Sequence, residues 1–438
     1  MNNTIIEKIF KHTKGFDTHI ILNSTKGSLT RFGDNEISQN VSTSETRADV
    51  RIIRDGKIVK FIISRFSDDD IKIVVKKAVE TLNVLKKAPF IPEPTRTEVK
   101  IDSKRYYDEK TANMSPSERA YCIKDILKFC KKTQRLSYGI VSNSEDEVVV
   151  ANNIGLYQRY KATKINYEII VNKNNAYGKA VGYSYKNDIN FNSINEIAVK
   201  KSDMACSPVE IKPGRYTVII EPLAFVEVFS FFSYLGFNAL AYYENRSFAS
   251  GNLGKKLFSE KVSIIDDPFD MPVMPFDLEG MPRERVVLVE NGVLKNVVTD
   301  KKTSKLTGLP YTGNSIFEPN SYGAISLSLS MLPGKKTSDE IIADTDRALL
   351  VTDFHYTNPL KPKSLEITGM TRNGTYLVEN GKIKKAVKNM RFTQSMVEAL
   401  NNVEDISSDR KTLSEWIASI SVPTVKIKNF NFSSGTEF

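Results

Sequence analysis

The sequence predicts an α+β protein of two domains, and its length, composition and order of elements lead to this fold class. The chain has 438 residues, whereas one domain usually takes about 100–200. Hydrophobic residues make up 40% of the chain and aromatic residues 10%, which is ordinary for a globular protein with a large core. Predicted strands and helices come in clusters without strict β–α–β alternation. We therefore expect mixed or antiparallel sheets with flanking helices.

The first predicted elements are a helix and a set of short strands. The helix is predicted over Thr4–Thr13, where apolar residues recur at three- and four-residue spacing. Four short strands separated by turn residues follow: Thr18–Asn23, Ser28–Gly33, Ile37–Thr43 and Ala48–Arg54. Asp55-Gly56 is expected to close a tight hairpin into Lys57–Ser64, because both residues tolerate positive φ. Ser67 is the predicted N-cap of the next helix, whose first turn, Asp68–Asp70, is acidic.

A proline-rich connector, residues 88–94, leads to the second half of this domain. Ser115-Pro-Ser-Glu118 has the pattern of a capping box with proline at the first helical position, which predicts a helix that runs to Thr133. Five further strands are predicted: Ser137–Ser142, Glu147–Ala151, Leu156–Thr163, Ile165–Val171 and Tyr177–Tyr183. A last helix near Ile194–Met204 leads to the predicted boundary at Cys206-Ser-Pro208. Residues 1–205 would then form an N-terminal α+β domain, and residues 206–438 a sheet-rich C-terminal domain.

The C-terminal domain begins with a predicted strand, Gly214–Ile220, and a predicted helix over residues 222–243. Two later segments share one design, an apolar strand that ends in Asn-Gly: Val287–Leu294 and Tyr376–Ile383. Asn-Gly supplies the two positive-φ residues of a tight hairpin, so both segments indicate a sheet. The remaining predicted elements are two helices and a final strand: Ser338–Leu350, Thr393–Asn402 and Val422–Phe430.

Residues 222–243 contain one charged side chain, Glu227, and are the candidate for a membrane span. Pro222, Gly236 and the lack of a basic flank favour a buried core helix instead. Its polar residues recur at helical spacing and form one stripe on an otherwise apolar helix: Glu227, Ser230, Tyr234 and Asn238.

Charge and cysteine content favour a protein of the reducing cytoplasm over a nucleic-acid-binding or secreted one. The 62 basic and 52 acidic residues give a net charge of +10, which would suit a nucleic-acid partner. The basic residues are interleaved with acidic ones, however, which indicates a solvated surface. The three cysteines, Cys122, Cys130 and Cys206, form no C-x-x-C pair, and an odd number argues against a disulfide framework. The N-terminus lacks the pattern of a secretory signal.

The sequence offers no complete catalytic motif. A hydrolytic zinc site usually needs three protein ligands and a water. The chain has three histidines, and only His355 lies in the C-terminal half, since His12 and His19 are near the N-terminus. No Gly-x-Ser-x-Gly elbow and no phosphate-binding Gly-x-x-x-x-Gly-Lys-Ser/Thr loop is present. Asp266-Asp267 precedes Pro268 and is interpreted as a turn.

Several segments of the C-terminal half together resemble one known family. They are Ser247-Phe-Ala-Ser-Gly-Asn-Leu-Gly254, Pro275-Phe-Asp-Leu-Glu-Gly-Met-Pro-Arg283, Thr312-Gly-Asn314, Val351–Pro359, Ile367–Gly374 and Lys388–Ser395. With these segments the chain resembles the TldD/PmbA family, the modulators of DNA gyrase and zinc metallopeptidases, from about Cys206 to Glu404. The last three segments are similar to the TldE (PmbA) branch, which lacks the zinc motif and pairs with the peptidase branch.

The resemblance implies that this chain lacks the zinc site. Placed without gaps from Ser250-Gly251, the His-Glu-x-x-x-His motif of the peptidase branch falls on Ser230, Phe231 and Leu235, none of which is a zinc ligand or a base. The late cysteine ligand of that branch is also missing from residues 403–438. We therefore expect no cofactor in this chain and zinc in a catalytic partner.

The spacing of that motif also bears on helix geometry. Its two histidines are five residues apart, which is roughly 140° more than one full turn of a regular helix. A homologue that binds one metal through both needs a bend in the helix, or a metal reached from the helix end. Gly236 would permit a break or close packing there.

The resemblance further implies a function in peptide processing. It makes the chain the non-catalytic subunit of a zinc metallopeptidase complex, a dimer with a TldD-like subunit or with itself, which degrades or trims unstructured peptides. The candidate peptide contacts are polar residues of the family-typical segments: Asp277, Glu279, Arg283, Thr312, Asn314 and His355. Two alternatives remain open. One is a metallopeptidase active in its own right through an unrecognised site, and the other is a DNA- or gyrase-associated binding protein.

Overall fold

The computed structural model describes residues 2–96, 99–100, 105–271, 273–415 and 418–436, and within them the strands form two sheets. The first sheet is built by residues 17–184 and is antiparallel throughout. The second is built by residues 214–435 and mixes antiparallel with parallel pairs. The α+β class predicted from the sequence is confirmed. The domain boundary after residue 205 falls between the two sheets and stays a prediction.

The N-terminal sheet consists mainly of long strands. They are β1 Asp17–Gly33, β2 Glu36–Arg54, β3 Lys57–Ile63, β4 Leu136–Asn152, β5 Tyr157–Lys173 and β6 Ala176–Ser184, in the order β3-β2-β1-β4-β5-β6. The prediction of short strands is wrong, because eight of them merge in pairs into β1, β2, β4 and β5. The polar stretch Ser24–Lys26, which suggested a break, is paired in register with both β2 and β4. The hairpins turn at Asp34-Asn35 and Asp55-Gly56, all four residues having positive φ.

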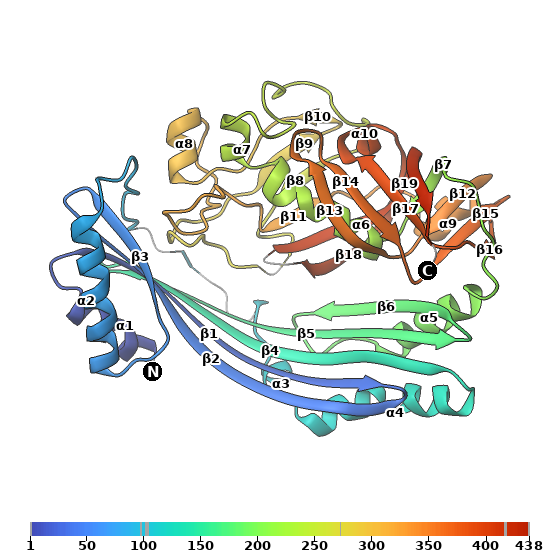
Figure 1. The fold of residues 1–438 in the computed structure, drawn as a ribbon, viewed down its shortest axis with the longest axis horizontal. Helices are drawn as coiled ribbons and strands as arrows, with labels where there is room; N and C mark the ends of the chain where they lie inside the picture. Colours follow the sequence, from blue (N-terminus) through green and yellow to red (C-terminus); the bar gives the residue numbers. More distant parts are fainter. Residues whose placement is uncertain (1, 97–98, 101–104, 272, 416–417, 437–438) are drawn as a thin grey trace.

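Helices pack at both ends of this sheet. They are α1 Asn2–His12, α2 Asp68–Val84, α3 Glu109–Ala112, α4 Pro116–Lys132 and α5 Phe191–Met204. Figure 1 shows α1 and α2 at one end and α4 and α5 at the other. The predicted caps are confirmed: Ser67 accepts a hydrogen bond from the Asp70 N–H, and Ser115 with Glu118 forms a capping box.

The C-terminal half contains a branched sheet with short helices. Its strands are β7 Gly214–Ile220, β8 Ile264–Asp266, β9 Val286–Glu290, β10 Val293–Leu294, β11 Ser328–Met331, β12 Arg347–Val351, β13 Phe354–Lys361, β14 Glu366–Thr371, β15 Thr375–Glu379, β16 Lys382–Ala386, β17 Met390–Ser395, β18 Val403–Glu415 and β19 Ala418–Gly435. Its later helices are α8 Lys301–Thr307, α9 Ser338–Ala343 and α10 Met396–Asn401, with a 3-10 turn at Pro362–Ser364.

The order of strands in the C-terminal sheet bears on two predictions, the Asn-Gly hairpins and the helix Ser338–Leu350. Its main path is β10-β9-β8-β11-β19-β7-β12-β15-β16, and β19 also carries β18 and the branch β17-β14-β13. Asn291-Gly292 and Asn380-Gly381 turn the hairpins β9–β10 and β15–β16 with positive φ, as predicted. The predicted helix Ser338–Leu350 is wrong in its second half: α9 ends at Ala343, and Arg347–Val351 is strand β12, hydrogen-bonded between β7 and β15.

The apolar segment 222–243 is buried in the core as predicted, but it is not one helix. It forms α6 Pro222–Phe231, a π-helical turn Phe232–Gly236, and α7 Ala239–Tyr243. Its phenylalanines belong to the main hydrophobic cluster of the C-terminal half. Gly236 permits close packing, since a Cβ there would lie 2.7 Å from Phe248 Cε1. In the part of the chain that is described, no helix is both long and apolar enough to cross a membrane.

The two halves are in direct contact. Figure 1 shows the N-terminal sheet as a long curved band along one side of the C-terminal half. An apolar cluster joins them, with Ile21 and Val150 from β1 and β4 packed with Phe276 and Phe317 of two C-terminal loops. This contact positions the loops that carry most of the candidate site residues.

Candidate functional site

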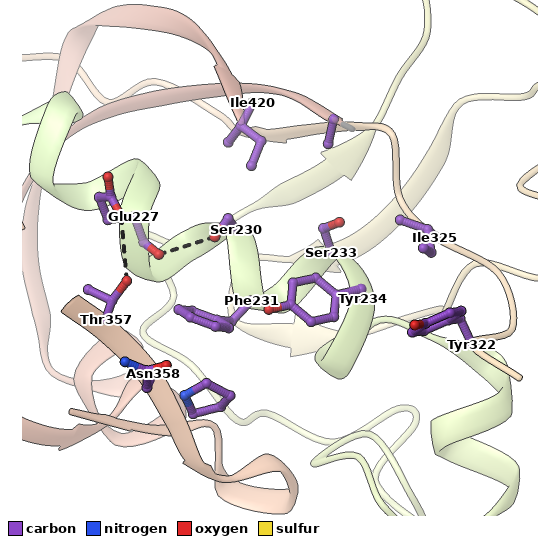
Figure 2. Close-up of a pocket in the computed structure, with 12 residues that line it drawn as sticks. Glu227, Ser230, Phe231, Ser233, Tyr234, Tyr322, Ile325, Thr357, Asn358 and Ile420 are labelled. Atoms are coloured by element: carbon purple, nitrogen blue, oxygen red, sulfur yellow. Dashed lines mark hydrogen bonds between the residues drawn. The ribbon is translucent and has the colours of Figure 1, made fainter. Parts of the chain in front are cut away.

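A cavity of about 340 Å³ lies beside the end of α6 (Figure 2). Its walls come from α6 with the π-helical turn, the loop before β11, strand β13 and the start of β19. The lining residues are Glu227, Ser230, Phe231, Ser233, Tyr234, Tyr322, Ile325, Thr357, Asn358, Pro359, Ala418 and Ile420. Three of the four members of the predicted polar stripe thus face a cavity, and the fourth, Asn238, caps α7 instead.

A π-helical turn breaks the helix at Phe232–Gly236, where the sequence indicated that Gly236 would permit a break. The Phe237 N–H donates to the Phe232 carbonyl, 2.8 Å away and five residues earlier, which is the π-helical pattern. Ser230 and Phe231 line the cavity, whereas Leu235 packs against the hydrophobic core. The three positions on which the zinc motif falls are therefore not gathered on the cavity wall of this chain.

The described lining of the cavity contains one carboxylate, Glu227, next to hydroxyl groups and aromatic rings. Thr357 Oγ1 donates to Glu227 Oε2 (3.4 Å), and Ser230 Oγ donates to the main-chain carbonyl of Glu227 (3.1 Å; Figure 2). The ring centroids of Phe231 and Tyr234 are 5.9 Å apart.

Three of the candidate peptide contacts, Arg283, Thr312 and Asn314, form a hydrogen-bonded group with Asp266 that lies outside the lining of this cavity. Arg283 Nη2 donates to both carboxylate oxygens of Asp266 (3.2 and 3.1 Å). Asn314 Nδ2 donates to Asp266 Oδ2 (2.6 Å), and Thr312 Oγ1 donates to Asn314 Oδ1 (2.8 Å). All four side chains are buried. The contacts described here lie within the chain, and peptide contact by these residues stays a prediction.

Two further candidates, Asp277 and Glu279, lie where the same loop meets the N-terminal sheet. Arg51 of β2 donates to Glu279 Oε1 (2.5 Å) and Oε2 (2.8 Å), and also to the Glu318 carbonyl (3.0 Å). Asp277 accepts hydrogen bonds from the N–H groups of Glu279 and Met281, both at 3.0 Å. These contacts make the loop part of the joint between the two halves.

Burial and charge shift the pKa values of Asp277 and Glu279 in opposite directions. Burial raises the pKa of Asp277 to about 6, although several groups donate hydrogen bonds to it. Burial also acts to raise the pKa of Glu279, but the charge and hydrogen bonds of Arg51 outweigh it and lower this pKa to about 2. Separated pKa values can mark an acid–base pair. Here the residues are 0% and 1% exposed, so a structural role at the joint fits better.

The last candidate, His355, lies on β13 near the cavity but outside its lining. Its ring centroid is 4.2 Å from that of Tyr356, and burial lowers its pKa. His19 belongs to the joint, because its Nε2 lies 2.9 Å from the Leu278 carbonyl, and burial lowers its pKa to about 4. None of the described residues that line the α6 cavity is a histidine.

Comparison with known proteins places the chain in a family. The sequence model of the PmbA/TldA metallopeptidase C-terminal domain matches residues 213–434, just over half of the chain. The chain belongs to the TldD/PmbA family. This confirms the resemblance that the sequence motifs indicated.

Curated relatives of the family are similar to parts of the chain. The Metalloprotease TldD homolog of Buchnera aphidicola is 31% identical over 170 residues, covering 36% of this chain and 34% of that protein. The Zinc metalloprotease TldD homolog of Saccharolobus solfataricus is 28% identical over 222 residues, 45% of each chain. The chain thus spans a third to a half of these relatives. An uncharacterized protein of Methanocaldococcus jannaschii is 25% identical over 417 residues, covering 91% of this chain and 95% of that protein.

Solved structures match the fold over nearly the whole chain. A putative modulator of a DNA gyrase from Thermotoga maritima has a TM-score of 0.85 at 21% identity, covering 98% of this chain and 100% of that one. TldE from Thermococcus kodakarensis has a TM-score of 0.84 at 22% identity, covering 98% and 99%. At this identity the likeness establishes the shared fold of the TldD/PmbA family.

Zinc, which the name of the Saccharolobus relative implies, does not fit the residues of this α6 cavity. Zinc is held in proteins by thiolate, imidazole or carboxylate groups. The motif positions offer a hydroxyl, a phenyl ring and an isobutyl group, from Ser230, Phe231 and Leu235. Glu227 is the single zinc-binding side chain in the described lining. Among the described residues, no three His, Cys, Asp or Glu side chains are grouped so that they could hold a metal ion.

We expect the purified chain to bind no stoichiometric zinc. The physical reason is the donor set, since one carboxylate cannot replace three ligands. Elemental analysis after dialysis against a zinc-containing buffer tests this. One tightly held zinc per chain would contradict the expectation. The variant His355→Ala would then test whether His355, two residues before the lining residue Thr357, is a zinc ligand.

Sequence reasoning missed most of the cavity wall outside α6. Tyr322, Ile325, Thr357, Asn358 and Ile420 line it. No local pattern marks these residues as a group, because they lie in three segments that meet only in the folded chain. The nearest signal was the family-typical segment Val351–Pro359, which includes the β13 part of the lining.

Proposed function

We propose that this chain is a non-catalytic, TldE-like subunit of a TldD-type zinc metallopeptidase complex that degrades or processes unstructured peptides. The observation that carries the proposal is the α6 cavity. It has an open volume lined by one carboxylate, hydroxyl groups and apolar side chains. By the family resemblance, Ser230 and Phe231 stand where the zinc motif has a ligand and a base. This combination favours a site that still binds a chain but cannot cleave it. Zinc, base and water would come from the partner.

The strand beside the cavity supports a peptide as the bound species. Within the described residues β13 pairs with β14 alone, so it is an edge strand, and Thr357–Pro359 of this strand line the cavity. An extended peptide that adds to such an edge is held through main-chain hydrogen bonds, which tolerate many sequences. This fits the processing of unstructured peptides.

The partner is proposed to be a TldD-like subunit, with a second copy of this chain as the other arrangement. Several relatives are named TldD homologs, and one of the matching structures is TldE. A subunit that lacks the zinc donors needs a chain that has them. A dimer with a TldD-like subunit therefore explains the degenerate motif more directly than a dimer of two identical chains.

The isolated chain is expected to have no peptidase activity, and activity should appear when it is mixed with a homologue that carries His-Glu-x-x-x-His. The reason is that this chain lacks both the Lewis acid and the base. Hydrolysis of a disordered fluorogenic peptide by each chain alone and by the mixture measures this, with a chelator as the control.

Two results would contradict the proposal and support one of the two alternative functions. Steady, chelator-sensitive hydrolysis by this chain alone would mean a peptidase with its own unrecognised site. DNA binding that weakens steeply with salt would mean a nucleic-acid partner, since phosphate contacts release counterions.

A further inference from the structure

We propose that the α6 cavity is a specificity subsite that receives one basic side chain, lysine or arginine, of the bound peptide, with Glu227 as its counter-ion. This inference rests on the proposed function and adds a substrate class to it. The peptide main chain would run along β13, and the cavity would select the side chain that points into α6.

The charge of the lining favours a cation. Among the described lining residues Glu227 is the acid, and none is lysine, arginine or histidine. Glu227 is half-buried, and a carboxylate in such a place interacts with a nearby charge more strongly than one in bulk water. An acidic side chain or a phosphate would meet like charge here and be rejected.

The hydrogen-bonding groups near Glu227 also suit a cation. The Ser230 hydroxyl donates its hydrogen bond to the Glu227 main-chain carbonyl. The Thr357 hydroxyl donates its hydrogen bond to the Glu227 carboxylate. Both hydroxyl oxygens therefore present lone pairs rather than protons to a ligand. An ammonium or guanidinium group has only donors, so it matches these two acceptor oxygens and the Glu227 carboxylate.

Aromatic and aliphatic groups form the rest of the wall. Phe231 and Tyr234 stand close together, and Tyr322 is 67% exposed. Ring faces attract lysine and arginine head groups within about 6 Å. Ile325 and Ile420 provide apolar surface for the methylene stem, which long basic side chains bury while the charged end reaches a polar partner.

The size of the cavity limits the ligand to a side chain. Its volume of about 340 Å³ is at the lower end of the range for small-molecule pockets, about 300–1,000 Å³. That room suits one long side chain and some water better than a nucleotide or a large cofactor. The occupant with matching charge, length and shape is lysine or arginine.

The test is a binding series with the full-length chain. Disordered, end-capped Gly/Ser-rich peptides that differ at one central position carry Lys, Arg, norleucine or Glu, and calorimetry measures each dissociation constant. We expect the Lys and Arg peptides to bind at least about tenfold more tightly than the norleucine peptide, since charge-assisted hydrogen bonds are stronger than neutral ones. The Glu peptide should bind most weakly. The net charge of +10 acts in the opposite direction, so a preference for Lys cannot come from the overall field.

Two variants and one control locate the preference. Glu227→Gln keeps the shape and removes the charge, so it should abolish the difference in affinity between the Lys and norleucine peptides. Circular dichroism and the denaturation midpoint show whether the variant is folded. Tyr322→Ala, at an exposed position, should reduce the preference several-fold. The matched control is Glu260→Gln, whose side chain is 77% exposed and outside the cavity, and it should change nothing.

The possible outcomes separate this inference from the function on which it rests. If all four peptides bind equally well, the peptide-binding function stands and the basic subsite is wrong. If the preference for Lys persists in Glu227→Gln, a different acid makes it and the subsite is wrong as well. If no peptide binds even when a zinc-containing partner is added, the proposed function fails together with the subsite.

Discussion

Replacing Arg51 by methionine is expected to lower the free energy of unfolding by about 3–5 kcal/mol, because it leaves a buried carboxylate without its partner. Arg51 is 2% exposed and Glu279 is 1% exposed, so water cannot take over the lost hydrogen bonds. Arg51 also lies over the Phe317 ring, 5.0 Å from its centroid. The change therefore removes a bidentate ion pair and a stacking contact at the joint between the two halves. Chemical denaturation followed by circular dichroism measures the loss.

The pH dependence of this loss has a defined sign. In the unmodified chain the pKa of Glu279 is lowered from 4.5 to about 2, so its stabilisation is complete above pH 4.5 and is lost as the pH falls towards 2. In Arg51→Met, burial without the guanidinium raises this pKa above its ordinary value, and the folded state then favours protonated Glu279. The deficit should be largest at neutral pH and should shrink below pH 4.5.

Two controls separate the buried pair from a general effect of removing arginine. Arg51→Met combined with Glu279→Leu removes both charges and should recover much of the loss, since apolar replacements of a buried pair are often neutral. Arg246→Met removes an exposed partner of Glu244, with both side chains more than 40% exposed, and should cost less than about 1 kcal/mol. An unchanged denaturation midpoint in Arg51→Met would show that the joint does not depend on this pair.

The triple change Ser230→His, Phe231→Glu and Leu235→His is expected to destabilise the fold and to leave peptidase activity absent. Phe231 is 7% exposed and belongs to the hydrophobic core, and losing a buried phenylalanine costs about 3–5 kcal/mol. The new glutamate would lie four residues after Glu227, where like charges on a helix repel each other. Leu235 packs on the core and away from the cavity lining, so a histidine there is not aimed at a common metal.

Because the third zinc ligand is missing, the triple variant is expected to lack peptidase activity even if it folds stably. Residues 403–438 contain no cysteine, and His355 lies outside the cavity lining. Zinc content, peptide hydrolysis and the denaturation midpoint should be measured on the triple variant and on Ser230→His alone. The single change sits on a half-buried cavity wall and should be tolerated far better. A folded triple variant that holds zinc and cleaves peptides would overturn both the geometry of this site and the non-catalytic role.

Particular residues explain which parts of the fold were predictable. Asp55-Gly56, Asn291-Gly292 and Asn380-Gly381 form tight turns because positive φ is a property of the residues themselves. Ser115 with Glu118 forms a capping box for the same local reason. Ser24–Lys26 misled the prediction, because its polar residues extend a strand only when β2 and β4 supply hydrogen bonds on both sides.

The candidate site also has parts that the sequence predicted and parts that it did not. The sequence placed Glu227, Ser230 and Tyr234 on one face of a helix, and the structure puts a cavity against that face. It also indicated that Gly236 would permit a break in the helix, and the structure has a π-helical turn at Phe232–Gly236. The five-residue spacing indicated that Ser230 and Leu235 face different sides of a regular helix. It did not reveal that the helix changes to a π-helical turn at Phe232–Gly236, next to the Phe248 ring.

By itself, the sequence determined the α+β class, the turns and caps, and the family. These depend on residue types at neighbouring positions, and neighbouring positions are read directly from the chain. Only the tertiary structure decided that Arg51 and Glu279, 228 residues apart, form the joint, and that α6, β13 and β19 enclose one acidic cavity. Such contacts arise when distant segments share one core, and the free energy of that packing is not encoded in any local pattern.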